Sequence, residues 1–289
     1  MEKEMKIAVL IDAENIAPKY IGVILSEANS LGNVIFKRIY GNWTSPQMNS
    51  WKDVILDNSL QPIQQYNNAS GKNSSDSSLI IDAMDLLYSG RLNAFCIVSS
   101  DSDFTRLAAR LRESEVHVLG MGEQKTPRSF ISACNKFAYL DILYNNSKGG
   151  KPLRRPEKPH EKKPNAVEEK AVPPKQATAA TVAAAPVKVL PKEEEKEKEE
   201  SNGLAREEIR SSLIQFAEEK ADDDGWIHAA KLADLLGKKF PDFDARNFGQ
   251  KTFLPFVMSL KLFEMKRKQT VVYLKLKQVR EQTAENGEA

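Results

Sequence analysis

The sequence predicts an α/β fold in which helices cover both faces of a parallel sheet, followed by a small C-terminal domain on a linker. Three observations carry this prediction. Strand-like apolar runs alternate with helical patterns over residues 6–144, as in proteins built from βα units. Near residue 145 the composition changes abruptly, and prolines and charge runs replace core periodicity. Helical spacing returns at residue 203 and ends in an alternating pattern typical of a hairpin.

The N-terminal elements are expected in strict alternation along the chain. The strands are expected at Lys6–Ile11, Val34–Tyr40, Pro62–Gln65, Ala94–Val98, Val116–Met121 and Phe137–Leu140. The helices are expected near Tyr20–Asn29, Ser45–Asp57, Asp76–Ser89, Phe104–Glu113 and Arg128–Cys134. Pro18 and Pro127 fit the first turn of a helix, and Gly90 fits a helix end.

The C-terminal elements predict a winged helix-turn-helix. Amphipathic helices are expected at Leu204–Lys220 and His228–Phe240, and Asp244 is expected to cap a third helix. Residues Leu262–Lys277 alternate around an expected turn at 266–269, which is typical of a hairpin. The third helix is expected to carry Phe248, Phe253, Phe256 and Leu260.

These patterns divide the chain into four parts. The charge run Lys192–Glu200 is interpreted as a solvated segment of the linker, because it has no apolar face. The parts are an α/β domain at 1–146, a disordered linker at 147–202, a winged-helix domain at 203–280 and a disordered tail at 281–289.

The bulk composition points to a cytoplasmic protein. The formal net charge is +2, so neither sign dominates the 289 residues as a whole. The two cysteines, Cys96 and Cys134, lie in apolar surroundings and are expected to be reduced core thiols, with no zinc cluster. No signal peptide is expected, and no apolar run is long enough to span a bilayer, so no membrane partner is predicted.

Acidic residues follow the predicted strands at three places. Asp12 ends the first strand, Asp101 and Asp103 follow the fourth, and Asp76 starts a helix. The carboxyl ends of parallel strands lie together, so acids far apart in sequence are expected to meet at one edge of the sheet. Clustered carboxylates repel unless a cation lies between them. The pattern predicts a Mg²⁺ or Mn²⁺ site that serves phosphodiester chemistry.

Two neighbouring residues suit substrate contacts. Asn15 is expected to position a phosphate oxygen or a water molecule of the metal, and Lys72 to contact a backbone phosphate. Structural alternatives stay open for several acids. Asp76 and Asp103 are also ordinary helix caps, and Asp82 is also a paired or solvated helix residue.

Together these residues resemble the motifs of NYN domains, the LabA-like branch of PIN-fold nucleases. The resemblance rests on Ile11–Ile16, on Lys72–Asp76 with Asp82, and on Val98–Phe104, and it covers residues 6–144. It implies a PIN-like sheet and metal-dependent ribonuclease activity. The acidic site that the resemblance implies is Asp12, Asp76, Asp101 and Asp103, with Asp12, Asp101 and Asp103 as metal ligands and Asn15 as a polar companion.

Two other acidic α/β classes fit poorly. Haloacid-dehalogenase phosphatases need a second aspartate two residues after the first, where this chain has Glu14. Response-regulator receivers need a phosphoacceptor after a central strand, whereas Asp101 lies in a Ser-Asp-Ser-Asp cluster. The fold alone decides nothing between such classes.

The C-terminal region resembles LOTUS, or OST-HTH, domains. The resemblance rests on Gly225–Ile227, Leu232–Phe243 and Asn247–Leu254, and it implies binding of RNA or, in some members, of protein. Phe243 and Phe248 are candidates for stacking on bases, but core packing is the favoured interpretation. A basic set that suits phosphate contacts comprises Lys238, Lys239, Arg246, Lys251, Lys266, Arg267 and Lys268, with Lys261 beside them.

The sequence as a whole therefore predicts a metal-dependent endoribonuclease in two parts. One domain cuts RNA, and the other holds RNA nearby on a tether. The alternative is a non-catalytic RNA-binding or scaffolding factor with a vestigial acidic cleft. A protein partner for the C-terminal domain, a homodimer through a sheet edge, and DNA in place of RNA stay open.

Overall fold

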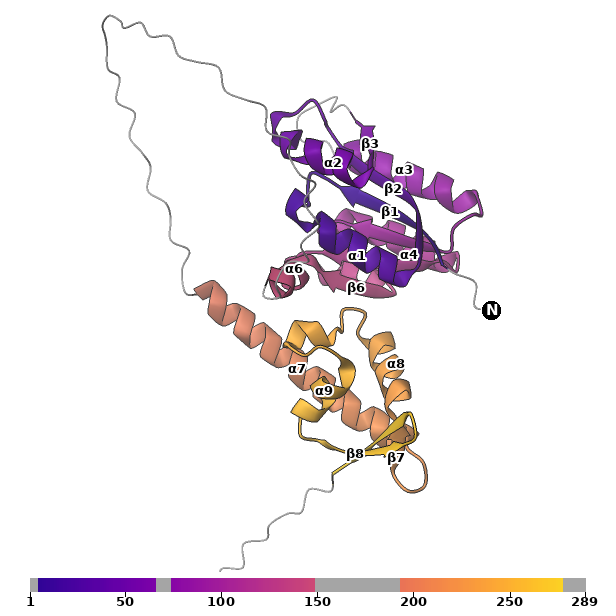
Figure 1. The fold of residues 1–289 in the computed structure, drawn as a ribbon, viewed down its shortest axis with the longest axis vertical. Helices are drawn as coiled ribbons and strands as arrows, with labels where there is room; N and C mark the ends of the chain where they lie inside the picture. The colour runs from indigo at the N-terminus through magenta and orange to yellow at the C-terminus, as the bar shows by residue number, and fades with distance from the viewer. Residues whose placement is uncertain (1–4, 66–73, 149–192, 278–289) are drawn as a thin grey trace, which may run out of the picture. The chain divides into compact units, whose positions relative to one another are not determined.

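The structure is a computed structural model that describes residues 5–65, 74–148 and 193–277 (Figure 1). The N-terminal region contains a sheet of six strands, all parallel. Its strands are β1 (Lys6–Asp12), β2 (Asn33–Gly41), β3 (Gln61–Gln64), β4 (Ala94–Val98), β5 (His117–Gly122) and β6 (Lys136–Tyr139). Its helices are α1 (Ile21–Leu31), α2 (Lys52–Asn58), α3 (Ser74–Tyr88), α4 (Thr105–Glu113), α5 (Arg128–Ala133) and α6 (Leu140–Lys148).

The strand order places the two acidic strand ends side by side. The order is β3-β2-β1-β4-β5-β6, so the chain leaves β1 towards one edge of the sheet and returns to build the other half from β4. In the register, Ile7 lies beside Ala94 and Ile11 beside Val98. Such a reversal of strand order is where open α/β sheets bind ligands, outside the carboxyl ends of the strands.

Each face of the sheet has its own core. Successive residues of a strand point to opposite faces, so Val9 and Ile11 join the core under α1 and α6, while Ala8 and Leu10 join the core under α3 and α4. All six residues that follow Lys6 in β1 are buried, as expected for a central strand between two layers of helices (Figure 1). The predicted fold class is confirmed.

Two details of the N-terminal region differ from the prediction. Residues predicted as one helix at Ser45–Asp57 form a 3₁₀ segment, η2 (Pro46–Trp51), followed by α2. The chain also continues past β6 into α6, which the pattern did not predict. Leu140 and Leu143 of α6 are buried in the core, and their spacing of three residues is a helical signal obscured by the polar residues that follow.

The C-terminal region forms a small helical layer over a three-stranded antiparallel sheet, in a winged-helix arrangement (Figure 1). The buried residues that join the layers include Leu213, Leu232, Phe256 and Leu274. The elements are α7 (Glu193–Lys220), β7 (Trp226–His228), α8 (Ala229–Lys239), η4 (Ala245–Phe248), α9 (Phe253–Ser259), β8 (Phe263–Lys268) and β9 (Val271–Leu276).

The predicted third helix of this region is broken in two. Asp244 caps only the short η4, and Gly249 then takes the left-handed conformation, with φ of 72°. A new helix, α9, begins at Phe253, so Pro255 lies in its first turn, where proline needs no intrahelical hydrogen bond. The hairpin turn was predicted at residues 266–269 but lies at 269–270. It begins three residues later because β8 extends through Lys268.

The predicted linker is only partly described. Helix α7 begins at Glu193, within the predicted linker, and contributes to the core from Ile209 onward. Residues 149–192 lie outside the described part of the chain, as do 278–289, which include the predicted tail. Within the described residues, none of the helices has the length and hydropathy that crossing a membrane requires.

Candidate metal centre and nucleic-acid interface

Four aspartates gather at the carboxyl edge of the N-terminal sheet. Asp12 is the last residue of β1, and Asp101 lies three residues after the end of β4. Asp103 follows within η3 (Ser102–Phe104), and Asp76 lies in the first turn of α3. Because β1 and β4 are neighbours, residues 12 and 101 are brought together by strand pairing despite their separation in sequence.

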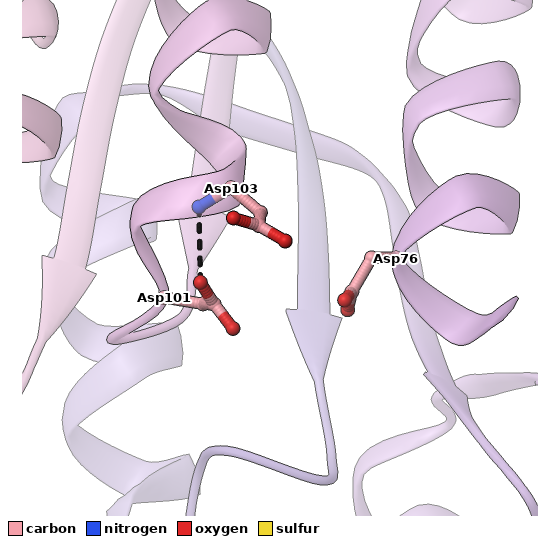
Figure 2. A group of neighbouring side chains, drawn as sticks. All are labelled: Asp76, Asp101 and Asp103. Atoms are coloured by element: carbon pink, nitrogen blue, oxygen red, sulfur yellow. Dashed lines mark hydrogen bonds between the residues drawn. The ribbon is translucent and has the colours of Figure 1, made fainter. Parts of the chain in front are cut away.

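Three of these carboxylates converge. One oxygen from each of Asp76, Asp101 and Asp103 lies within 4.8 Å of the other two, and Figure 2 shows the three side chains around a common space. Ligand oxygens at the usual Mg²⁺ distance would lie ~2.9 Å apart when adjacent and ~4.2 Å apart when opposite. The three residues therefore fit a small divalent cation with small side-chain movements, and carboxylate oxygen is the ligand type that Mg²⁺ and Mn²⁺ prefer.

Asp12 is not one of these three, and its surroundings differ from theirs. Its side chain is 1% exposed, and hydrogen bonds satisfy both carboxylate oxygens. Oδ2 accepts hydrogen bonds of 2.8 Å from Asn15 Nδ2 and of 2.8 Å from Ser99 Oγ. Oδ1 accepts from the backbone N–H groups of Glu14 and Asn15. Burial raises the pKa of Asp12, and the hydrogen bonds from Asn15 and Ser99 offset part of that rise.

Ser99 links the two acidic strand ends. Its Oγ donates to Asp12 and accepts a hydrogen bond of 3.0 Å from the backbone N–H of Asp101. The side chain is fully buried, so its position is fixed by packing as well as by these bonds. The loop after β4 is thereby held against the end of β1.

The capping role in this loop belongs to Asp101 and not to Asp103. The Asp101 Oδ1 atom accepts a hydrogen bond of 2.9 Å from the backbone N–H of Asp103, the second residue of η3 (Figure 2). This bond orients the Asp101 carboxylate, so the cap and the acidic centre share one residue. Asp76 lies inside the first turn of its helix, two residues after the first helical residue.

Repulsion among the acids shows most clearly at Asp76. Burial raises its pKa to about 7, and the negative charges of Asp12, Asp101, Glu14 and Asp103 add to the rise. A bound cation would reverse this electrostatic cost and favour the ionised form. The centre is thus built to be unfavourable when all its carboxylates are ionised without a counter-charge.

The remaining N-terminal candidates fall into different roles. Glu14 is exposed and accepts a hydrogen bond of 3.0 Å from Ser75 Oγ, which links the β1–α1 loop to the start of α3. Asp82 accepts hydrogen bonds from Arg38 and Tyr40, so the interpretation of Asp82 as a paired helix acid is confirmed. Lys72 lies outside the described residues.

Sequence reasoning missed Ser99 and Gly122 as supports of the centre. A Cβ atom on Gly122 would lie 2.7 Å from the Ser99 carbonyl oxygen, so only glycine lets β5 approach the loop after β4. The neighbouring Ser100 Oγ accepts a hydrogen bond of 2.9 Å from the backbone N–H of Glu123. The only signal for these roles was the position of Ser99 and Ser100 beside Asp101.

Comparison with known families identifies both regions. A model of the NYN domain matches residues 6–141, and a model of the OST-HTH/LOTUS domain matches residues 204–274. The chain is an NYN-domain protein with an OST-HTH/LOTUS domain. The predicted architecture is confirmed, and NYN domains are a PIN-like nuclease family.

Other comparisons are sparse. None of the curated proteins compared with the chain matches it. Among solved structures, a protein of unknown function from Vibrio parahaemolyticus is similar, with 18% sequence identity and a TM-score of 0.41. The similarity covers 47% of this chain and 93% of that one.

The basic residues predicted in the LOTUS domain are not equivalent. Asp244 binds the Arg246 guanidinium through several hydrogen bonds of 2.6–3.0 Å, and these bonds lower the pKa of Asp244 although burial opposes the shift. Lys238 pairs with Asp234, and Lys239 lies 5.5 Å from the ring centre of Phe216. The side chains of Lys251, Lys266, Arg267 and Lys268 are exposed.

The two candidate stacking residues of the LOTUS domain belong to its core. Phe243 and Phe248 pack face to face with ring centres 6.1 Å apart, and both rings also contact that of the buried Phe256. The favoured interpretation of these rings as core residues is confirmed.

Proposed function

We propose that the protein is a metal-dependent endoribonuclease whose NYN domain cuts RNA and whose LOTUS domain binds it in the cytoplasm. The observation that carries the proposal is the convergence of Asp76, Asp101 and Asp103 within 4.8 Å, at the strand ends of a nuclease-family domain. The NYN domain is taken as residues 1–146 and the LOTUS domain as 203–280, with residues 147–202 as the linker.

In this proposal the side chains divide the work. Asp76, Asp101 and Asp103 would hold Mg²⁺ or Mn²⁺, with Asp12 adding negative charge beside them. A bound divalent cation supplies an activated water and stabilises the charge that develops on the leaving oxygen. Ser99 and Asn15 fix the buried Asp12 carboxylate, and Ser99 also fixes the loop that carries Asp101. Lys72, on the motif before α3, is proposed to contact a phosphate of the substrate.

The LOTUS domain would raise the local concentration of RNA. We propose that its basic set contacts phosphates, chiefly through the four exposed side chains of Lys251, Lys266, Arg267 and Lys268. The other members of the set are Lys238, Lys239 and Arg246. A tether between the two domains turns the second contact with one RNA molecule into an intramolecular event. Affinity for the substrate then depends on the LOTUS domain, and the chemical step depends on the NYN domain.

Cleavage of labelled single-stranded RNA in the presence of Mn²⁺, Mg²⁺ or EDTA tests the proposal. We expect metal-dependent cleavage by the wild type and its loss in Asp12→Asn and Asp101→Asn. Asp85→Asn is the matched control, because Asp85 is an exposed acid on α3 outside the centre. Cleavage that survives both substitutions would refute the site. RNA binding without any cleavage would identify the protein as a non-catalytic adaptor instead.

A further inference from the structure

The sheet of the LOTUS domain has two faces of opposite character. Residues alternate between the faces along each strand, and the antiparallel register fixes which residues share a face. The inner face carries Ile227, Leu274 and Phe263, which are buried under the helices. The residues of the other face, here called the outer face, are Trp226, His228, Glu264, Lys266, Lys268, Val271, Tyr273 and Lys275.

The aromatic residues of the outer face do not serve the core. Trp226 and Tyr273 are half-buried, and neither belongs to the core cluster nor to the partly buried residues that pack against it. The core already has its own aromatic set on η4 and α9, centred on Phe256. Two large rings lie on the side of the sheet that points away from the core, where they expose apolar surface and do not contribute to core packing.

The outer-face rings are held in a defined arrangement. The rings of His228 and Tyr273, which are opposite each other in the register, meet edge to face with centres 5.5 Å apart. Two lysines lie over the Trp226 ring, with Lys266 Nζ 5.4 Å and Lys275 Nζ 5.8 Å from its centre. Ring and cation are therefore adjacent, which is the combination that binds a base and its phosphate together.

The charge of the outer face is positive and uneven. Lys266, Lys268 and Lys275 outweigh the single acid, Glu264. The turn before β7 carries the exposed acids Asp222, Asp223 and Asp224, so the region beside Trp226 is negative on that side. A polyanion would follow β8 and its lysines and avoid the acidic turn.

We propose that the outer face of the LOTUS sheet is a binding platform for single-stranded RNA. Bases would stack on Trp226 and Tyr273, and phosphates would contact the exposed Lys266 and Lys268. Stacking on aromatic side chains requires splayed, unpaired bases and tolerates most sequences, because every base has a π-face. The proposal rests on RNA binding by the LOTUS domain, as set out above, and assigns the surface that performs it.

The test measures binding of the full-length protein to a short, unstructured, fluorescently labelled RNA in EDTA, which prevents cleavage. We expect Trp226→Leu and Tyr273→Val each to weaken binding about tenfold, because a stacked base contributes substantially to affinity. Trp226→Phe keeps a ring and is expected to retain most of the affinity. Met265→Ala is the matched control, because Met265 lies on β8 but on the inner face.

A second pair of variants avoids the risk that an aromatic substitution unfolds the domain. Lys266→Gln and Lys268→Gln remove exposed charges and are expected to reduce both the affinity and its dependence on salt. Lys231→Gln, an exposed lysine on α8, is the matched charge control. A duplex RNA of the same sequence is expected to bind more weakly than the single strand, because its bases are already stacked.

The outcomes separate this proposal from the proposed function. Wild-type protein that binds no RNA at low salt would refute RNA binding by the LOTUS domain, and the platform with it. Wild-type affinity that is retained by Trp226→Leu, Tyr273→Val, Lys266→Gln and Lys268→Gln alike would refute only the platform. Equal affinity for single strand and duplex would also refute it, since contacts to phosphates alone do not require unpaired bases.

Discussion

The acidic centre of the NYN domain and the basic face of the LOTUS domain are built in opposite ways. Asp12 and Asp76 are 1% and 8% exposed, Asp101 is half-buried, and only Asp103 of the four is exposed, while hydrogen bonds from three segments of chain hold the centre in place. The lysines of the outer face are mostly exposed and lie along strands on a sheet surface. Enclosed charges act at short range, where position decides their effect, whereas exposed charges act through salt-dependent attraction.

This contrast predicts that the two sites control different steps. Changes at the acidic centre should act on the chemical step, and changes at the outer face should act on substrate binding. The largest expected effect concerns Asp76→Asn, which removes one of three converging carboxylates. We expect kcat to fall at least about hundredfold, because metal-assisted charge stabilisation supplies several kcal/mol.

Single-turnover cleavage, with the protein in saturating excess over the RNA, measures the chemical step, and Asp85→Asn on the same helix is its control. The affinity for RNA in EDTA should stay unchanged. If Asp76→Asn lowers RNA affinity and leaves the cleavage rate intact, the division of labour is wrong.

The next effect is a pH dependence of stability in the metal-free protein. Burial and neighbouring acids raise the pKa of Asp76 to about 7 in the folded state, above its value in an unfolded chain. The contribution of Asp76 to stability is therefore fully present only below its pKa in the unfolded chain, and it is lost as the pH rises to about 7. Asp76→Asn should remove the loss and stabilise the metal-free protein at pH 8 by on the order of 2 kcal/mol.

Urea unfolding in EDTA at pH 5 and pH 8 tests this linkage. In a Trp226→Phe background, the remaining tryptophans, Trp43 and Trp51, report on the NYN domain alone. Addition of Mn²⁺ should oppose the effect of high pH in the wild type. An equal pH dependence in Asp76→Asn would assign the linkage to other groups.

A smaller effect is expected from the outer face. The double variant Lys266→Gln/Lys268→Gln should raise KM about tenfold at moderate salt and leave kcat nearly unchanged, since the charges act in binding. The slope of log affinity against log salt should fall by about 1.4 for two lost contacts with a single strand. A fall in kcat with unchanged KM would show that these lysines act on the chemistry.

The smallest effect concerns an acid with a purely structural setting. Asp244 caps η4 and holds Arg246, and the bonds from Arg246 lower its pKa against the opposing effect of burial. Its contribution to stability is present above the unfolded pKa and is lost as the pH falls. Asp244→Ala should destabilise the LOTUS domain by about 1 kcal/mol and leave kcat unchanged. Hydrogen exchange of peptides that cover η4 measures the change.

The sequence predicted much of the frame of the NYN centre. Periodicity located β4 at Ala94–Val98, and the rule for strand ends predicted that Asp12 and Asp101 would meet. Both predictions combine the local residue pattern with the topology rules of parallel sheets, which few proteins violate. The predicted metal set included Asp12, whereas the three converging oxygens come from Asp76, Asp101 and Asp103.

The supports of the centre could not be predicted in the same way. Ser99 bonds to the end of β1 and to its own loop after β4, and no local pattern records that these two segments approach each other. The cap on η3 is Asp101, two residues before Asp103, for which the sequence had left a capping role open. In the LOTUS domain, Pro255 and Gly249 divided a helix whose apolar spacing was continuous. In these cases, contacts between segments distant in sequence, or the backbone conformations of proline and glycine, decided the structure against the periodicity.

The adjacency of β1 and β4 has a consequence for the synthesis of the protein. The carboxylates of the centre lie at residues 12, 76, 101 and 103, so a nascent chain that ends before residue 76 carries only one of them. Even a chain that contains all four must first close the long loop between the two strands, a slow event in folding. The acidic centre is therefore assembled late, after β4 has left the ribosome.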